Sequence, residues 1–199
     1  MRLIVITPEN GLWDNEIELY HWMFENGLDF LHLRKPLASR DAYKAILDQI
    51  DPRCYSRIVI HDHYDLVDEY PLAGWHLNDR NASTAPLGQN AFSASSHSIN
   101  ELRQRLSLCS EYCFLSPIFD SISKHGYSSA FDLSVLNPEV LGPQVIALGG
   151  IDSSNISLCQ QVGFSGIALL GYIWGRKEKE KSVEQIKQSF ESIIEKLKE

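Results

Sequence analysis

Eight short apolar runs recur along the chain, and helical stretches separate most of them. Each run is about five residues long, as β-strands usually are, and most are almost continuously apolar, which is typical of parallel strands covered on both faces. The runs are residues 3–7, 30–33, 57–60, 74–77, 91–95, 112–115, 144–148 and 166–170. Amphipathic patterns and capping residues predict helices at residues 14–26, 39–50, 98–108, 153–162 and 182–198. Strands that alternate with helices in this way favour a (β/α)8 barrel.

No Pro- or Ser-rich linker divides the chain, so we expect one domain over residues 1–199, a TIM barrel of minimal size. A doubly wound open parallel sheet is the structural alternative. Residues 78–90 and 118–130 have no clear helical period and are predicted to be long loops, a class that is often functional.

The charge balance excludes several kinds of partner. The chain has 18 Lys and Arg against 26 Asp and Glu, a formal net charge of −8, which argues against nucleic acid and against a polybasic membrane anchor. No apolar run approaches the ~20 residues that span a bilayer, and the first run is too short for a signal-peptide core. Cys54, Cys109, Cys113 and Cys159 are scattered and are interpreted as reduced core thiols. We therefore expect a cytoplasmic protein; a homo-oligomer is among the possible states.

The active site of a parallel barrel lies at the carboxyl ends of its strands, and here polar or glycine residues follow nearly every apolar run. Each of them taken singly is explained as well by strand capping or by a satisfied polar group in the core. Their recurrence at several strand ends favours a functional site.

Gly149 and Gly150 follow the seventh run and precede a predicted helix. Backbone N–H groups can approach an anion closely where no Cβ intervenes, and a helix N-terminus adds its dipole. Gly171, after the eighth run, would complete a phosphate site, because barrels often bind phosphate beyond strands seven and eight. A Gly-Gly pair elsewhere is usually only a turn.

Positive charge at the strand ends comes from Arg34, Lys35 and Lys124. The planar guanidinium of Arg34 suits phosphate oxygens, and Lys124 on a loop could close over an anion. Three ordinary surface cations are the alternative interpretation.

Two carboxylates and one histidine are further candidates. Asp62 and Asp79 follow adjacent runs and could hold Mg²⁺, which prefers carboxylates together with substrate phosphate; two solvated carboxylates are an equally good explanation. His97 is a candidate general acid or base near neutral pH, or a residue that merely precedes the helix beginning at Ser98.

Six segments, taken in order, resemble the thiamine phosphate synthase/TenI family over nearly the full length of the chain. They are FLHLRK (30–35), IHDHYDL (60–66), GWHL (74–77), SSHS (95–98), SPIFDSISK (116–124) and VIALGGI (145–151). The resemblance implies a (β/α)8 barrel that acts in thiamine biosynthesis, and it implies that the glycines of the last two strands hold a thiazole phosphate. With the strand-end positions, it indicates a set of substrate-binding residues: His32, Lys35, His61, Ser95, Ser121, Ser123, Gly149, Gly150, Leu170 and Gly171.

The family includes two reactions. Its synthases join hydroxymethylpyrimidine diphosphate to thiazole phosphate with Mg²⁺ and release pyrophosphate. Its TenI branch includes a tautomerase that aromatises the thiazole carboxylate phosphate by proton transfer and needs no metal. The resemblance implies that His97 moves the proton in the second reaction and that Arg34 and Lys124 bind anionic groups in either.

Several positions depart from the synthase pattern. Synthases usually have Gln at the position of His32, Lys at that of Pro36 and Asn at that of His61. Their second metal-binding Asp falls near Arg80 or Asn81, which are not carboxylates. Losing a Mg²⁺ ligand should weaken pyrophosphate departure, so the sequence slightly favours a tautomerase. The alternatives are a synthase and a non-catalytic protein that binds thiazole phosphate.

Overall fold

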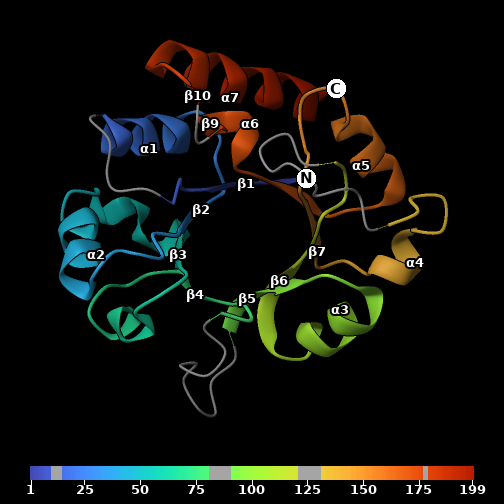
Figure 1. Cartoon of the computed structure of the whole chain (residues 1–199), viewed down its shortest axis with the longest axis horizontal. Coiled ribbons are helices and arrows are strands. Elements are labelled where there is room, and N and C mark those ends of the chain that lie inside the picture. Colours follow the sequence, from blue (N-terminus) through green and yellow to red (C-terminus); the bar gives the residue numbers. More distant parts are fainter. Residues whose placement is uncertain (10–14, 81–90, 121–130, 177–178) are drawn as a thin grey trace.

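The computed structural model describes residues 1–9, 15–80, 91–120, 131–176 and 179–199. Parallel strands pair in chain order and close into a barrel, because β8 pairs with β1 (Figure 1). These strands are β1 (Arg2–Ile6), β2 (Phe30–Leu33), β3 (Ile58–Ile60), β4 (Gly74–Leu77), β5 (Ala91–Ser96), β6 (Cys109–Leu115), β7 (Val145–Leu148) and β8 (Gly166–Leu169). The predicted closed barrel is confirmed, and the open doubly wound sheet is wrong.

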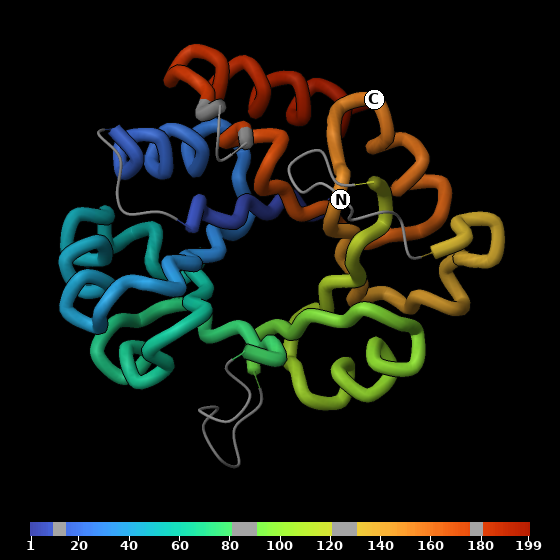
Figure 2. Tube along the Cα trace, viewed as in Figure 1, coloured from blue at the N-terminus to red at the C-terminus, as the bar shows by residue number. Residues whose placement is uncertain are grey.

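Helices surround the ring of strands on its outside (Figure 2). The α-helices are α1 (Glu16–Glu25), α2 (Arg40–Leu47), α3 (Ile99–Leu106), α4 (Pro138–Leu141), α5 (Ile156–Val162), α6 (Gly171–Trp174) and α7 (Val183–Lys198). Two 3-10 helices, η1 (Pro52–Arg57) and η2 (Tyr64–Asp68), flank β3, and β9 (Gly175–Arg176) pairs antiparallel with β10 (Lys179–Glu180). The sequence did not predict these short elements, because one or two turns are too short to show a hydrophobic period.

Capping residues fix where the longer helices begin. The hydroxyl groups of Ser39, Ser98 and Ser182 accept hydrogen bonds from backbone N–H groups in the first turns of α2, α3 and α7, as the sequence predicts. α5 differs, because it begins at Ile156 with Asn155 as its N-cap rather than at residue 153.

The core has two layers, because successive side chains of a strand point alternately into the barrel and out toward the helices. Leu3 and Val5 face outward and pack against the helices, whereas Ile4 and Ile6 point into the barrel. The interior cluster consists of Ile4, Ile6, Tyr112, Phe114, Ile146 and Ala168. The outward cluster joins the strands to the helices, including the buried face of α7.

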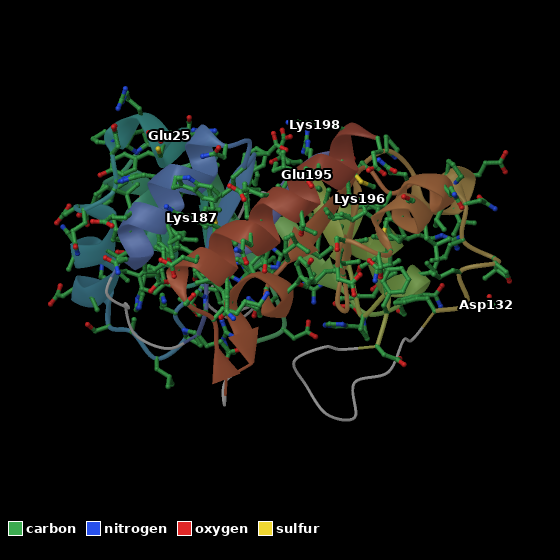
Figure 3. The ribbon with its side chains drawn as sticks, turned by 90° about the horizontal axis from the view of Figure 1, so that it is seen from above. Glu25, Asp132, Lys187, Glu195, Lys196 and Lys198 are labelled. Atoms are coloured by element: carbon green, nitrogen blue, oxygen red, sulfur yellow. The ribbon has the colours of Figure 1, made fainter. Side chains whose placement is uncertain are left out.

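The long helix α7 has an apolar face and a charged face. Ile186, Phe190 and Ile193 are buried, while Glu195 and Lys198 are exposed to solvent (Figure 3). Within the described residues, no helix combines the length and the apolar character needed to cross a membrane.

Candidate active site at the carboxyl ends of the strands

A pocket of about 360 Å³ opens at the carboxyl ends of the strands, within the range typical of small-molecule sites. Arg34, His97 and Gly150 are far apart in sequence, yet all three line it. Its other predicted lining residues are His61, Asp79, Ser95, Gly149, Leu170 and Gly171. The barrel topology brings them together because parallel strands end on the same side.

His97 lies between β5 and α3 and is oriented by Ser116 from the end of β6. Its Nδ1 is 3.0 Å from the Ser116 carbonyl oxygen and 3.3 Å from the Ser116 hydroxyl. A carbonyl oxygen can only accept a hydrogen bond, so Nδ1 carries the proton and the neutral ring presents a lone pair at Nε2. Glu101 Oε2 accepts a 2.8 Å hydrogen bond from the backbone N–H of His97. The side chain is therefore placed to take up a proton at Nε2.

Gly149 and Gly150 allow two segments to pass very close together. Both have positive φ, +94° and +66°, a region that residues with a Cβ rarely adopt. A Cβ on Gly149 would lie 2.9 Å from Pro117, and one on Gly150 would lie 2.4 Å from the Asp120 carbonyl oxygen. The pair also lines the pocket. Close packing against the segment after β6 thus requires glycine here, whether or not an anion binds.

The end of β8 continues directly into the short helix α6, whose first residue is Gly171. Trp174 at the end of α6 donates an indole N–H bond of 2.8 Å to the carbonyl oxygen of Ile6. This bond attaches α6 to the end of β1. Leu170 and Gly171 consequently border the pocket on the side of the β7 glycines.

Two guanidinium groups line the pocket at the ends of β2 and β4. Arg34 follows β2, and its Nη1 lies 2.5 Å from Glu9 Oε1; Thr7 Oγ1 accepts a 2.9 Å bond from the Arg34 N–H. Arg80 follows β4 and contacts Asp62. In an eight-stranded closed barrel, β4 lies across from β8, so Arg80 lies across the barrel from Gly171.

Lys35 is not at the pocket, which corrects the prediction that it binds substrate. Its side chain is 1% exposed, and Nζ lies 2.7 Å and 3.0 Å from the two carboxylate oxygens of Glu16 in α1. Successive residues after a strand point to opposite sides, so Lys35 faces the helix layer while Arg34 faces the pocket.

His32 also lies outside the pocket lining, because its ring points into the barrel interior. It is fully buried, with Nδ1 2.9 Å from His61 Nε2 and Nε2 2.6 Å from the Tyr112 hydroxyl. His61 stacks on His76 with ring centroids 4.3 Å apart. Contact of His32 with substrate is therefore not supported, and the residue instead supports His61.

The three interior histidines form a cluster of neutral rings, in which His32 is hydrogen-bonded to His61 and His76 stacks on His61. Burial lowers the pKa of His32 and His61 well below the usual range and lowers that of His76 to about 3. One nitrogen from each ring lies within 4.8 Å of the others, and such an all-imidazole set suits Zn²⁺ better than Mg²⁺. Both nitrogens of His76 are already taken by Ser93 and Ser95, at 2.8 Å and 2.7 Å. Both ring nitrogens of His32 and of His76 therefore already have hydrogen-bond partners.

The predicted magnesium ligands do not form a metal site. Asp62 Oδ1 and Oδ2 are 3.2 Å and 3.4 Å from the same Arg80 nitrogen, and the Tyr43 hydroxyl donates a 3.1 Å bond to Oδ2. Asp79 is largely exposed and paired with Arg105. The two carboxylates are each held by a guanidinium, so this donor set does not fit the Mg²⁺ that the resemblance implies.

Three predicted residues, Ser121, Ser123 and Lys124, lie outside the described residues. Ser95 is described, and its hydroxyl contacts His76 at the pocket wall. Arg80 and Ser116 also line the pocket, although the sequence did not predict either of them as a site residue. Arg80 comes directly after the fourth apolar run, as other predicted site residues follow theirs. The family pattern has a metal-binding Asp near this position, and that difference hid the arginine as a candidate in its own right. Nothing in the sequence identified the Ser116 carbonyl as the partner of His97.

Comparison with known proteins decides the family. Residues 3–173 match the TMP-TENI family, described as thiamine monophosphate synthase. The chain belongs to the thiamine monophosphate synthase family. It is 29% identical to the thiamine-phosphate synthase of Neisseria meningitidis over 157 residues, which cover 73% of this chain and 77% of that protein.

Solved structures of the family have the same fold as this chain. The crystal structure of thiamine phosphate pyrophosphorylase from Bacteroides thetaiotaomicron is 30% identical and superimposes with a TM-score of 0.81, covering 100% of this chain and 98% of that one. The enzyme of the same name from Pyrococcus furiosus is 20% identical, with a TM-score of 0.72 and coverage of 99% and 95%, which shows the shared fold. The family relatives compared here are named for the synthase reaction, so they favour it over the tautomerase that the sequence departures suggested.

Proposed function

We propose that this chain is a thiamine phosphate synthase that joins hydroxymethylpyrimidine diphosphate to thiazole phosphate and releases pyrophosphate. The observation that supports this function is a pocket with two regions suited to anions. Arg34 and Arg80 line it at the ends of β2 and β4, and Gly149, Gly150 and Gly171 line it at the ends of β7 and β8. A reaction between a diphosphate and a phosphate needs two such regions, one for each phosphate-bearing substrate.

In this reaction, the bond between the pyrimidine methylene carbon and the diphosphate oxygen breaks, and both electrons remain on oxygen. The lone pair of the thiazole nitrogen forms the new carbon–nitrogen bond. The thiazole thus gains one positive charge and the leaving group one negative charge. Arg34 stabilises the charge that grows on the diphosphate, because preorganised donors act most strongly where charge develops. Lys124 is proposed to act with it.

In the second region, the glycines are proposed to hold the thiazole phosphate, as barrels commonly do after strands seven and eight. Leu170, beside them, supplies apolar contact. His61 and Ser95 also line the pocket, and they are proposed to contact the pyrimidine and thiazole rings. Ser121 and Ser123 are proposed to contact the diphosphate.

Tautomerisation is the second candidate, and the orientation of His97 is what favours it. With Nδ1 directed at the Ser116 carbonyl oxygen, Nε2 is available as a base. In a synthase, the same His97 would bind and orient the diphosphate instead of moving a proton on carbon.

A two-arm assay with purified protein tests the proposal. One arm supplies hydroxymethylpyrimidine diphosphate and thiazole phosphate, and the other supplies the non-aromatic thiazole carboxylate phosphate. We expect thiamine phosphate and pyrophosphate in the first arm and no aromatisation in the second. Aromatisation alone, abolished by His97→Ala, would establish the tautomerase. Silence in both arms, with thiazole phosphate still bound, would identify a binding protein.

A further inference from the structure

Arg80 covers the carboxylate that the family resemblance assigns to a metal ion. Its Nη2 lies between the two oxygens of Asp62, at 3.2 Å and 3.4 Å. Arg80 lines the pocket, whereas Asp62 does not. A ligand in the pocket therefore meets the guanidinium group rather than the carboxylate behind it.

Among the described residues that line the pocket, no carboxylate is left unpaired to restore a magnesium site. Asp79 pairs with Arg105, and its side chain is 70% exposed; Glu9, the other carboxylate of the pocket lining, pairs with Arg34. The segments 81–90 and 121–130, which follow β4 and β6, contain neither Asp nor Glu. Mg²⁺ is usually held by one or two carboxylates together with phosphate oxygens, and Asp62, Asp79 and Glu9 are each already paired with a guanidinium group.

A guanidinium group can take over the electrostatic part of the role of a divalent cation. It keeps its charge at any relevant pH and offers a planar fork that matches two phosphate oxygens. Asp62 and, behind it, the Tyr43 hydroxyl form a chain of hydrogen bonds that holds the fork in one place. A second cation beside Arg80 would meet like-charge repulsion.

We infer that Arg80 stands in the place of the metal ion and binds the diphosphate directly, so that this pocket handles its diphosphate ligand without Mg²⁺. This inference rests on the proposed function for the identity of the diphosphate substrate. Asp62 is then a positioning residue that aims Arg80 through their ion pair. The negative charge that the leaving group gains is stabilised by protein cations, Arg80 and Arg34 together with Lys124, rather than by a metal ion.

Calorimetry of inorganic pyrophosphate binding to the purified chain tests the role of Arg80 without turnover. The titration is done first in EDTA and then in excess Mg²⁺. We expect binding in EDTA that Mg²⁺ does not strengthen. Arg80→Ala should weaken it about 10- to 100-fold, since hydrogen bonds to charged groups contribute roughly 1.5–3 kcal/mol. Arg80→Lys should bind with intermediate affinity, because it keeps the charge but loses the fork. Arg53→Ala removes an exposed guanidinium outside the pocket and should bind like the unaltered chain.

Binding that needs Mg²⁺, or that Arg80→Ala leaves unchanged, would overturn the inference. Circular dichroism of each variant shows whether the fold is intact. Turnover separates this inference from the proposed function. Coupling of the two substrates in Mg²⁺ but not in EDTA would retain the synthase and refute the metal-free pocket. No coupling under either condition would refute the synthase, and pyrophosphate binding in EDTA would still decide the role of Arg80.

Discussion

Lys35 and Glu16 form an ion pair that is shut off from solvent between β2 and α1. The lysine is 1% exposed and the glutamate side chain 0%, with Nζ 2.7 Å from Oε1. Tyr20 donates a hydrogen bond to the same carboxylate oxygen, and the Tyr43 hydroxyl accepts a 3.0 Å bond from the Lys35 N–H. The pair anchors the segment from which Arg34 enters the pocket.

Removing the lysine from this pair should destabilise the fold strongly. Lys35→Met leaves the Glu16 charge buried without its partner, which typically costs about 3–5 kcal/mol. Urea unfolding measures the loss. Lys44→Met breaks an exposed pair with Glu69 and should cost less than about 1 kcal/mol. Equal losses in the two variants would contradict the assignment of a structural role to Lys35.

Acid should destabilise the protein through the interior histidines. Their pKa values in the folded state lie below 6.5, that of His76 at about 3, so the unfolded state binds more protons in this window. The free energy of unfolding should therefore be fully retained above pH 6.5 and fall as pH drops toward 3, by about 1.4 kcal/mol per pH unit for each histidine that stays neutral.

Variants separate this effect from general acid unfolding. His61→Asn and His32→Gln, the residues usual at these positions in synthases, should flatten the slope. Urea titrations at several pH values give these slopes, and a slope that is the same in all variants would contradict the prediction.

Adding a methyl group at Gly150 should disturb both packing and the pocket. The new Cβ would lie 2.4 Å from a backbone oxygen, in addition to the strain of φ +66°. Gly142 has a similar φ, +75°, but open space at its Cβ position. Gly142→Ala should cost about 1–2 kcal/mol for the left-handed backbone, and Gly150→Ala clearly more. Thermal unfolding compares the two variants. Equal losses of stability would show that the close approach at Gly150 does not by itself require glycine.

The four cysteine thiols should be inert in the native protein. All four are free and buried, and burial raises the pKa of Cys109 to about 11 and those of Cys113 and Cys159 to about 12. Because the thiolate is the reactive form, a disulfide reagent at neutral pH should label them only after unfolding. Fast labelling of the native chain would contradict their placement.

The sequence by itself predicted the strands and helices and favoured a closed barrel over an open parallel sheet. Apolar runs of strand length, separated by capped amphipathic stretches, specify both the elements and their order, because periodicity and capping are local properties. The buried face of α7 and the glycines after β7 were predicted in this way. The positions of the apolar runs also placed Arg34 and His97 at the ends of strands, and the structure brings both residues to one pocket.

Only the tertiary structure decided where neighbouring side chains point and which charges pair. Arg34 and Lys35 are adjacent and both cationic, yet one faces the pocket and the other a buried glutamate. The sequence treated Arg80 as a missing carboxylate, whereas the barrel places it against Asp62. Such contacts join residues 18 or 19 positions apart in the chain, and closure of the barrel, rather than any local pattern, sets the distance between them.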